Sequence, residues 1–181
     1  KAVEKGADGL IAVAAGAGGH AGRLSPFPLI SEIRRWYNGP LALSGAIASG
    51  DAVLAAQAMG ADFGYIGSAF IATKEARADE LYKQMIVDSE ADDIIYSNLF
   101  TGVHGNYLAP SVKAAGMDPN NLPEGDISTM NFGDWDKKPK AWKEIWGCGQ
   151  GIGSVTDILN VEDLVLRLEA EYLKAKTRIS V

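Results

Sequence analysis

Short apolar runs recur along the first 75 residues of the chain, and longer polar stretches separate them. The runs at residues 10–15, 41–44 and 63–67 are too short for confident helices and are apolar on both faces. This pattern predicts three strands that are buried on both faces.

The stretches between these runs are helical in pattern. Residues 28–38 begin with a proline and are followed by a glycine, which is typical of a helix start and stop. A second helix ends at Met59 and is closed by Gly60, with Ser49 or Asp51 as its capping residue. Strands that alternate with helices predict consecutive βα units of a parallel sheet.

The pattern changes after about residue 75. Residues 76–87 predict a helix, and residues 92–100 are ambiguous but favour an extended segment. Residues 116–140 are rich in Pro, Asn, Asp and Gly, which indicates a long irregular connection. Residues 139–146 predict a short helix with two tryptophans, and the segment 135–146 is a candidate interface between copies of the chain.

The last helix is the clearest in the sequence. Asn160 is the predicted N-cap, acidic residues follow in the first turn, and lysines lie near the end. One face carries apolar residues at helical spacing, which predicts packing against the core. These residues are Val161, Leu164, Val165, Leu168, Tyr172 and Leu173.

Composition narrows the classes of partner. The chain has 181 residues and a formal net charge of −6, which argues against nucleic acid or an anionic membrane. No segment approaches the ~20 apolar residues that span a bilayer, and we expect no basic and apolar leader. Cys148 is the only cysteine, so we expect no internal disulfide and a cytoplasmic location. With His20 and His104 as the only histidines and no zinc-type spacing, we expect no bound metal.

Small residues follow each of the three predicted strands. The first strand runs into the glycine-rich turn that carries Gly18, Gly19 and His20, and the next two run into segments 44–50 and 67–70. In parallel α/β folds the carboxyl ends of the strands are where ligands bind. Backbone N–H groups exposed by small residues at two successive strand ends suit a phosphate monoester.

These motifs resemble the nitronate monooxygenases, which are FMN-dependent (β/α)₈-barrel enzymes. The resemblance rests on Ala17–Gly22 (AGGHAG), on SGAIASG at 44–50 and on GSAF at 67–70, and the WGCGQG segment at 146–151 extends it. It implies an α/β fold in which the chain is the C-terminal portion of a TIM barrel, about strands six to eight, with a small mainly helical segment. Residues 1–75 would carry the FMN and catalytic loops, 76–155 a helical and irregular substrate-side segment, and 156–181 a helix packed on the barrel.

The resemblance also implies roles for individual residues. His20 would be the catalytic base beside the flavin ring. Gly18 and Gly19 would pass close to the cofactor, and backbone donors for the FMN phosphate would come from two further pairs. The pairs are Gly45 with Ala46 and Gly67 with Ser68, while Gln150 and Gly151 would reach the polar edge of the flavin.

The implied reaction is the oxidation of alkyl nitronates or nitroalkanes by O₂ to a carbonyl compound and nitrite. A histidine suits removal of the α-proton of a nitroalkane, because imidazole is largely neutral at pH 7. Two alternatives stay open: an FMN-dependent NAD(P)H reductase of the enoyl-thioester or quinone type, and a non-catalytic flavin-binding fragment that needs a partner chain. Strands one to five have no counterpart in the sequence, so we expect the rest of the barrel to come from a missing chain or segment.

For the remaining candidate residues, a structural role is favoured over a catalytic one. His104 reads as a loop histidine, and Cys148 as a small core residue without a catalytic partner. Asn106 and Tyr107 either line a substrate pocket or pack in the core.

Overall fold

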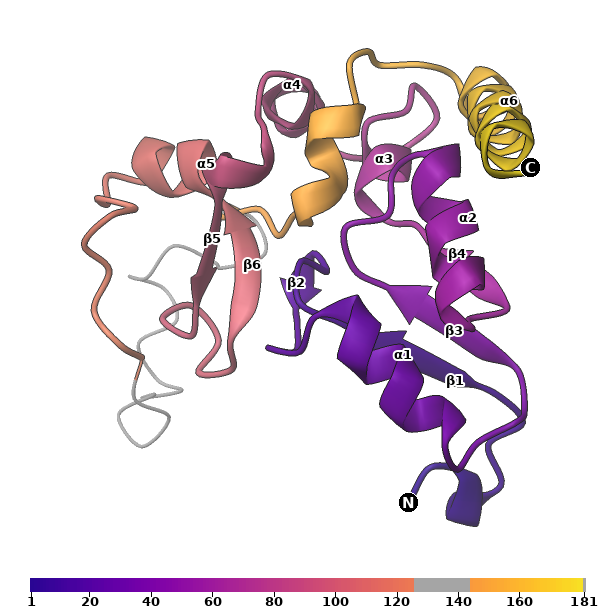
Figure 1. The fold of residues 1–181 in the computed structure, drawn as a ribbon. Coiled ribbons are helices and arrows are strands. Elements are labelled where there is room, and N and C mark those ends of the chain that lie inside the picture. The colour runs from indigo at the N-terminus through magenta and orange to yellow at the C-terminus, as the bar shows by residue number, and fades with distance from the viewer. Residues whose placement is uncertain (126–143, 181) are drawn as a thin grey trace.

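The computed structural model describes residues 1–125 and 144–180, which form a mixed α/β structure (Figure 1). Its elements in chain order are η1 (Val3–Lys5), β1 (Leu10–Val13), β2 (Gly19–His20), α1 (Pro26–Arg34), β3 (Leu41–Ser44), α2 (Gly50–Met59), β4 (Phe63–Tyr65), α3 (Ser68–Ile71), α4 (Glu80–Val87), η2 (Ala91–Asp93), β5 (Ile94–Ser97), β6 (Gly105–Leu108), α5 (Ala109–Ala114), η4 (Gln150–Ser154) and α6 (Val161–Ile179). None of the described helices is both long and apolar enough to cross a membrane.

The first sheet confirms the predicted βα units. Strands β1, β3 and β4 are parallel and adjacent in that order. Helices α1 and α2 cover one face of this sheet (Figure 1), where Leu41, Leu43 and Ile30 are almost fully buried. This apolar core forms because alternate residues of each strand point toward the helices.

The opposite face of the same sheet is open, so the prediction of strands buried on both faces was wrong. Ile11, Val13, Phe63 and Tyr65 alternate with the buried residues and are between 42% and 59% exposed. In the register of the sheet, Ile11 lies beside Ala42, which lies beside Phe63. The apolar residues on this face are therefore contiguous across three strands. We call this surface the open sheet face.

A second, antiparallel sheet joins segments that are far apart in the sequence. Its strand order is β2-β6-β5, with Gly19 opposite Asn106 and His20 opposite Gly105. The glycine-rich turn that we predicted around His20 is therefore tied into a short strand. The described residues of 76–155 were expected to be helical and irregular, but they also hold two strands, β5 and β6.

The helix boundaries follow from their caps. Ser49 caps α2 by accepting from the backbone N–H of Ala52, and Asn160 caps α6 by accepting from Asp163, as predicted. Helix α4 begins at Glu80 and not at residue 76, because Asp79 caps it. Helix α1 covers Pro26–Arg34 where we predicted 28–38.

Arg34, the last residue of α1, contacts the turns that precede two strands. Its guanidinium donates to the carbonyl of Gly60 at 2.6 Å and of Gly39 at 2.8 Å. It also pairs with Asp62 at 2.8 Å, and Asp62 accepts from the amide of Leu41. The side chain therefore anchors the end of α1 to the turns that precede β3 and β4.

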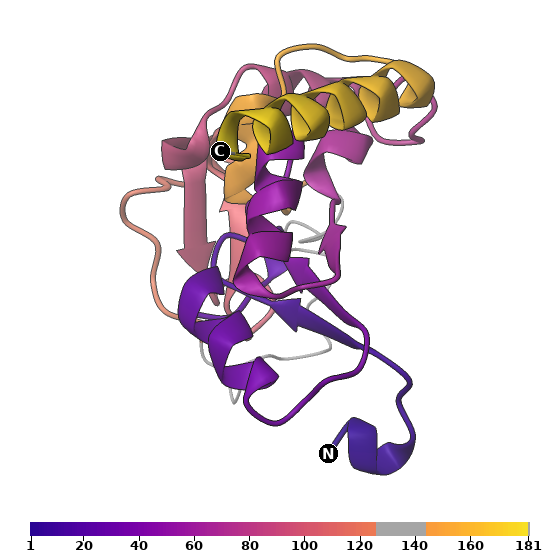
Figure 2. The same ribbon diagram turned by 45° about the vertical axis from the view of Figure 1, so that its right-hand side comes forward.

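Helix α6 lies across α2 (Figure 2). Leu164 is buried, and Glu171 accepts from the backbone amide of Gly50 at 2.8 Å. A Cβ on Gly50 would lie 2.2 Å from the carbonyl of Leu168, so a glycine is required where the two helices cross. The prediction that the whole apolar face of this helix packs against the core was wrong at two positions, because Val165 and Leu173 are about half exposed.

Two sequence predictions fall largely outside the described residues. These are the short helix at 139–146 and the candidate interface at 135–146. The described end of that segment, residues 144–146, is not helical.

Candidate functional site

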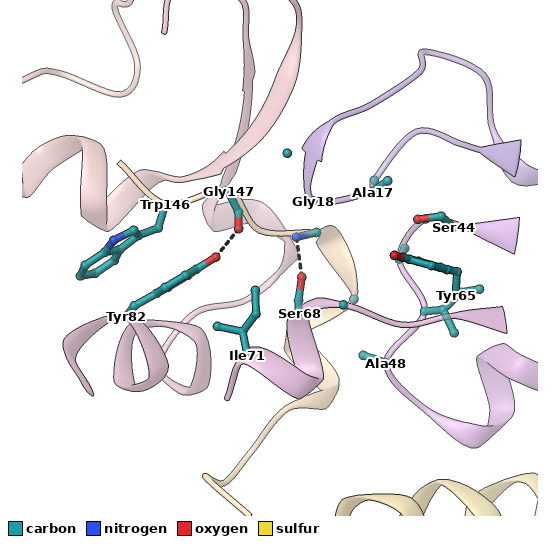
Figure 3. Close-up of a pocket in the computed structure, with 18 residues that line it drawn as sticks. Ala17, Gly18, Ser44, Ala48, Tyr65, Ser68, Ile71, Tyr82, Trp146 and Gly147 are labelled. Atoms are coloured by element: carbon teal, nitrogen blue, oxygen red, sulfur yellow. Dashed lines mark hydrogen bonds between the residues drawn. The ribbon is translucent and has the colours of Figure 1, made fainter. Parts of the chain in front are cut away.

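A cavity of about 310 Å³ lies where the carboxyl ends of β1, β3 and β4 face the 146–151 segment (Figure 3). Eight of its eighteen lining residues are glycine. They are Gly16, Gly18, Gly19, Gly45, Gly67, Gly147, Gly149 and Gly151. Its volume falls at the lower end of the ~300–1,000 Å³ typical of small-molecule sites.

On one side of the cavity the glycines allow backbone to lie directly against backbone. A Cβ on Gly18 would lie 2.8 Å from the amide nitrogen of Gly149, and one on Gly151 would lie 2.8 Å from the carbonyl oxygen of Ala46. The carbonyl of Gly16 accepts from the amides of Ala46 at 3.2 Å and Gln150 at 2.9 Å. Side chains at these positions would push the loops apart.

Gly67 differs from these packed glycines. A Cβ on Gly67 would meet no atom within 4 Å, although Gly67 lines the cavity. Its φ of −117° is open to any residue, so backbone conformation does not demand glycine there. Next to it, the hydroxyl of Ser68 accepts from the amide of Gly149 at 3.0 Å. The cavity is therefore open beside Gly67, at the N-terminal end of α3.

The loop after β3 has a strained backbone. Ala46 has a φ of +56°, the left-handed conformation that side chains disfavour. Among the described residues it is the one non-glycine with positive φ. Its amide donates to Gly16, so this conformation ties the β3 loop to the β1 loop.

Aromatic side chains flank the glycine-lined space. Tyr82 and Trp146 stack with ring centres 4.8 Å apart on one side, and Tyr65 lies on the other (Figure 3). The Tyr82 hydroxyl donates to the carbonyl of Gly147. Burial raises the pKa of Tyr82 well above its usual value, with a smaller contribution from nearby Cys148, so the phenol stays protonated.

His20 lies directly after the lining glycines, and the second sheet holds it there. Asn106, itself buried, donates from Nδ2 to the carbonyl of Ala17 at 2.7 Å. Tyr96 donates to the carbonyl of Ala21 at 3.1 Å. The exposed His20 ring meets the Thr101 hydroxyl, with 3.0 Å between Nε2 and Oγ1. Backbone on both sides of His20 is therefore fixed.

Most of the residues expected at the site come together around the cavity. Seven of them line it, namely Gly18, Gly19, Gly45, Ala46, Gly67, Ser68 and Gly151. His20 and Gln150 are not among the lining residues of the described part of the chain, although each directly adjoins one. Gln150 begins η4, and its side-chain oxygen would lie 2.8 Å from a Cβ on Gly16.

The lesser candidates are in packing positions. Cys148 is fully buried, and burial raises the pKa of its thiol to about 11, which leaves it protonated and unreactive. The His104 ring stacks on Tyr96 with centres 4.9 Å apart. Asn106 and Tyr107 are buried and do not line the cavity. No group of three or more His, Cys, Asp or Glu in the described ranges could hold a metal ion.

The sequence alone did not single out Thr101, Tyr96, Tyr82 or Tyr65. The first two reach the site only because β6 pairs with the distant strand β2, and β5 pairs with β6. Tyr65 had a local signal, since it ends the third strand of a parallel sheet. For Tyr82, the sequence predicted only that it lies in a helix.

A glycine-lined cavity at the carboxyl ends of parallel strands is where α/β proteins typically bind small molecules. The sequence model of the family described as nitronate monooxygenase matches residues 1–171. The chain therefore belongs to the nitronate monooxygenase family.

Similar proteins extend beyond this chain. The nitronate monooxygenase of Paraburkholderia phytofirmans is 30% identical over 125 residues, which cover 64% of this chain and 34% of that protein. A nitroalkane oxidase from Streptomyces ansochromogenes has 29% identity and a TM-score of 0.72, covering 99% of this chain and 56% of that one. FabK from Thermotoga maritima shares the fold, with a TM-score of 0.77, 24% identity, and coverage of 98% and 58%. The chain thus spans about a third to just over half of the length of these relatives.

Proposed function

We propose that this chain carries the cofactor and base side of an FMN-dependent enzyme that oxidises alkyl nitronates and nitroalkanes with O₂. The products would be a carbonyl compound and nitrite. The observation that carries the proposal is the placement of His20 on β2, immediately after the glycines that line the cavity. Membership of the nitronate monooxygenase family supports it.

Several features of the cavity support FMN as its ligand. Gly18 and Gly19 line the cavity without side chains of their own, and the space beside Gly67 admits a group that a side chain would displace. In the first turn of α3 the amide of Ser68 has no acceptor within the helix and can donate to a phosphate oxygen. The amide of Ala46 already donates to Gly16, so we assign Gly45 and Ala46 to loop shape. FMN, when bound, supplies the electron-accepting ring and passes electrons to O₂.

His20 would act before the redox step. With a neutral nitroalkane its imidazole accepts the α-proton, the C–H electron pair moves into the nitro group, and a nitronate results. With a preformed nitronate no base is needed. The protein's contribution is to hold the base and the substrate in register beside the cofactor.

We further propose that the parallel sheet is part of a (β/α)₈ barrel, in the position of strands six to eight. The open sheet face supports this, because an inward-facing apolar surface on three strands is what the interior of a barrel requires. The greater length of the relatives agrees with it. The remaining strands would then cover the open sheet face.

Anaerobic reduction of the FMN-loaded protein tests the function. We expect ethylnitronate alone to bleach the flavin bands near ~370 and ~450 nm. Bleaching by NADH or NADPH alone would contradict this and support the reductase. A protein that takes up no FMN would support the non-catalytic alternative.

Replacing the base gives a second test. His20→Asn is expected to abolish turnover of neutral nitroalkanes and to spare preformed nitronates, since only the former must lose a proton. His104→Asn is the matched control and is expected to change neither. Equal loss on both substrates would contradict the assignment of His20.

A further inference from the structure

Asn106, on β6, is bonded to two segments that line the cavity. In the antiparallel pairing of β2 with β6 it lies opposite Gly19. Its carbonyl accepts from the amide of Cys148 at 3.1 Å, next to the point where Gly147 bridges to β6. Gly19 and Gly147 both line the cavity, although Asn106 itself does not. One strand residue therefore joins the loop after β1 to the 146–151 segment.

The side chain of Asn106 adds a further contact to the loop after β1. Its Nδ2 donates to the carbonyl oxygen of Ala17 at 2.7 Å, and both residues are at most 5% exposed. A carbonyl oxygen only accepts, so the group that faces it must carry a proton. Because the bond is buried, a carbonyl that lost its donor would stay unsatisfied.

These contacts matter because the two segments meet backbone to backbone. A Cβ on Gly18 would lie 2.8 Å from the amide nitrogen of Gly149, and one on Gly147 would lie 3.2 Å from the Cα of Gly19. These glycines have no side chains that could adjust to fill a gap, so a shift of either segment changes the shape of the cavity directly. A misplacement of ~1 Å at a functional site can cost ~10²-fold in rate.

We propose that Asn106 is a positioning residue that holds the 16–19 loop against the 147–149 segment and so determines how tightly the cavity binds its cofactor. It acts through the backbone of these two segments, since it does not itself line the cavity. That the cofactor is FMN rests on the proposed function; the connection that Asn106 makes between the two segments does not.

Asn106→Asp tests the donor with almost no change of shape. At pH ~8 the carboxylate would face the carbonyl of Ala17 without a proton, and we expect the Kd for FMN to rise about tenfold. At pH ~5 we expect the carboxyl to be protonated and to donate again, because burial raises the pKa of a carboxyl group. The Kd should then return toward the wild-type value. Each comparison is made at one pH, because a phosphate monoester itself titrates near pH ~6.

Two further variants serve as controls. Asn106→Leu keeps the volume but cannot donate at any pH, so its Kd should be raised by the same factor at both. It adds no charge, which keeps the test open if Asn106→Asp does not fold at the higher pH. Asn98→Asp removes a bond of the same kind elsewhere, since Asn98 donates to the carbonyl of Gly125 at 3.1 Å and does not line the glycine-lined cavity. It should leave the Kd unchanged.

Hydrogen–deuterium exchange of the FMN-free protein gives a readout that does not need the cofactor. We expect faster exchange in peptides covering residues 16–20 and 146–151 in Asn106→Leu, and in Asn106→Asp at the higher pH. Exchange there should be unchanged in Asn98→Asp. A role confined to stability would instead lower the midpoint of urea unfolding and leave the Kd of the folded protein unchanged, and that result would overturn the proposal.

A rise in Kd that is the same at both pH values in Asn106→Asp would also overturn the positioning role. Failure of the proposed function has a different signature. A wild-type protein that takes up no FMN, with exchange in the two segments faster only in the Asn106 variants, would keep the connection and reject the cofactor.

Discussion

Replacing Gly67 with alanine separates ligand binding from folding at the cavity. The added methyl meets no protein atom within 4 Å, and the backbone at φ −117° accepts alanine. The free energy of unfolding should therefore change by less than about 0.5 kcal/mol. The same methyl takes up space in which we place the cofactor, and overpacking of that kind costs about 1–3 kcal/mol. We expect the Kd for FMN to rise by about fivefold to 150-fold, since 1.4 kcal/mol corresponds to a factor of ten.

Urea unfolding and titration with FMN, followed by flavin fluorescence, give the two quantities. Gly153→Ala is the matched control, because its methyl also meets nothing within 4 Å and Gly153 does not line the cavity. It should change neither stability nor Kd. Gly18→Ala is the contrast, because its methyl would lie 2.8 Å from the amide nitrogen of Gly149. It should lose about 1–3 kcal/mol of stability.

Two results would refute this reasoning. An unchanged Kd in Gly67→Ala would mean that the cofactor does not occupy the space beside Gly67. A loss of stability as large as that of Gly18→Ala would mean that the space is not open in the folded protein.

Three further outcomes are expected. Ala46→Gly should raise the free energy of unfolding by up to about 1 kcal/mol in urea, because glycine removes the strain at φ +56°; a loss would contradict that account. The amide of Leu41, and then Arg34, lower the pKa of Asp62 below its ordinary 3.8. The ionised Asp62 carboxylate therefore stabilises the folded state above that value, and this contribution is lost as the pH falls through the folded-state pKa. Unfolding of wild type and Asp62→Asn should thus differ most near neutral pH and converge in acid. Cys148 should resist alkylation in the folded protein and react at the unfolding rate, because burial raises the pKa of its thiol to about 11; fast labelling would show an open core.

Local signals predicted the first half of the fold well. Glycine after a helix, serine or asparagine before one, and short apolar runs located the βα units, since each depends on neighbours in sequence. The same signals could not show that Ile11 and Phe63 face outward, because an apolar run reads alike whether one or both faces are covered. Burial depends on which helices pack against the sheet.

The glycine-rich segments of the sequence predicted where the site lies. Gly18 and Gly67 were both singled out, yet the sequence did not distinguish the packed glycine from the open one. Thr101 escaped notice because its contact with His20 depends on pairing between β2 and β6, which lie far apart in the chain. A helix cap depends on residues close in sequence and can be predicted locally, whereas the antiparallel pairing of distant strands cannot.

The carbonyl of Gly16 accepts from two segments that follow it in the chain, a near one through Ala46 and a distant one through Gln150. Closing the second of these loops requires the chain to return over more than a hundred residues, and such long-range closure carries a large entropic cost and slows folding. The cavity therefore exists only once the chain has folded globally, with no smaller unit that contains it. A ligand that fills it should stabilise the whole chain by mass action, and the midpoint of unfolding should rise with ligand concentration.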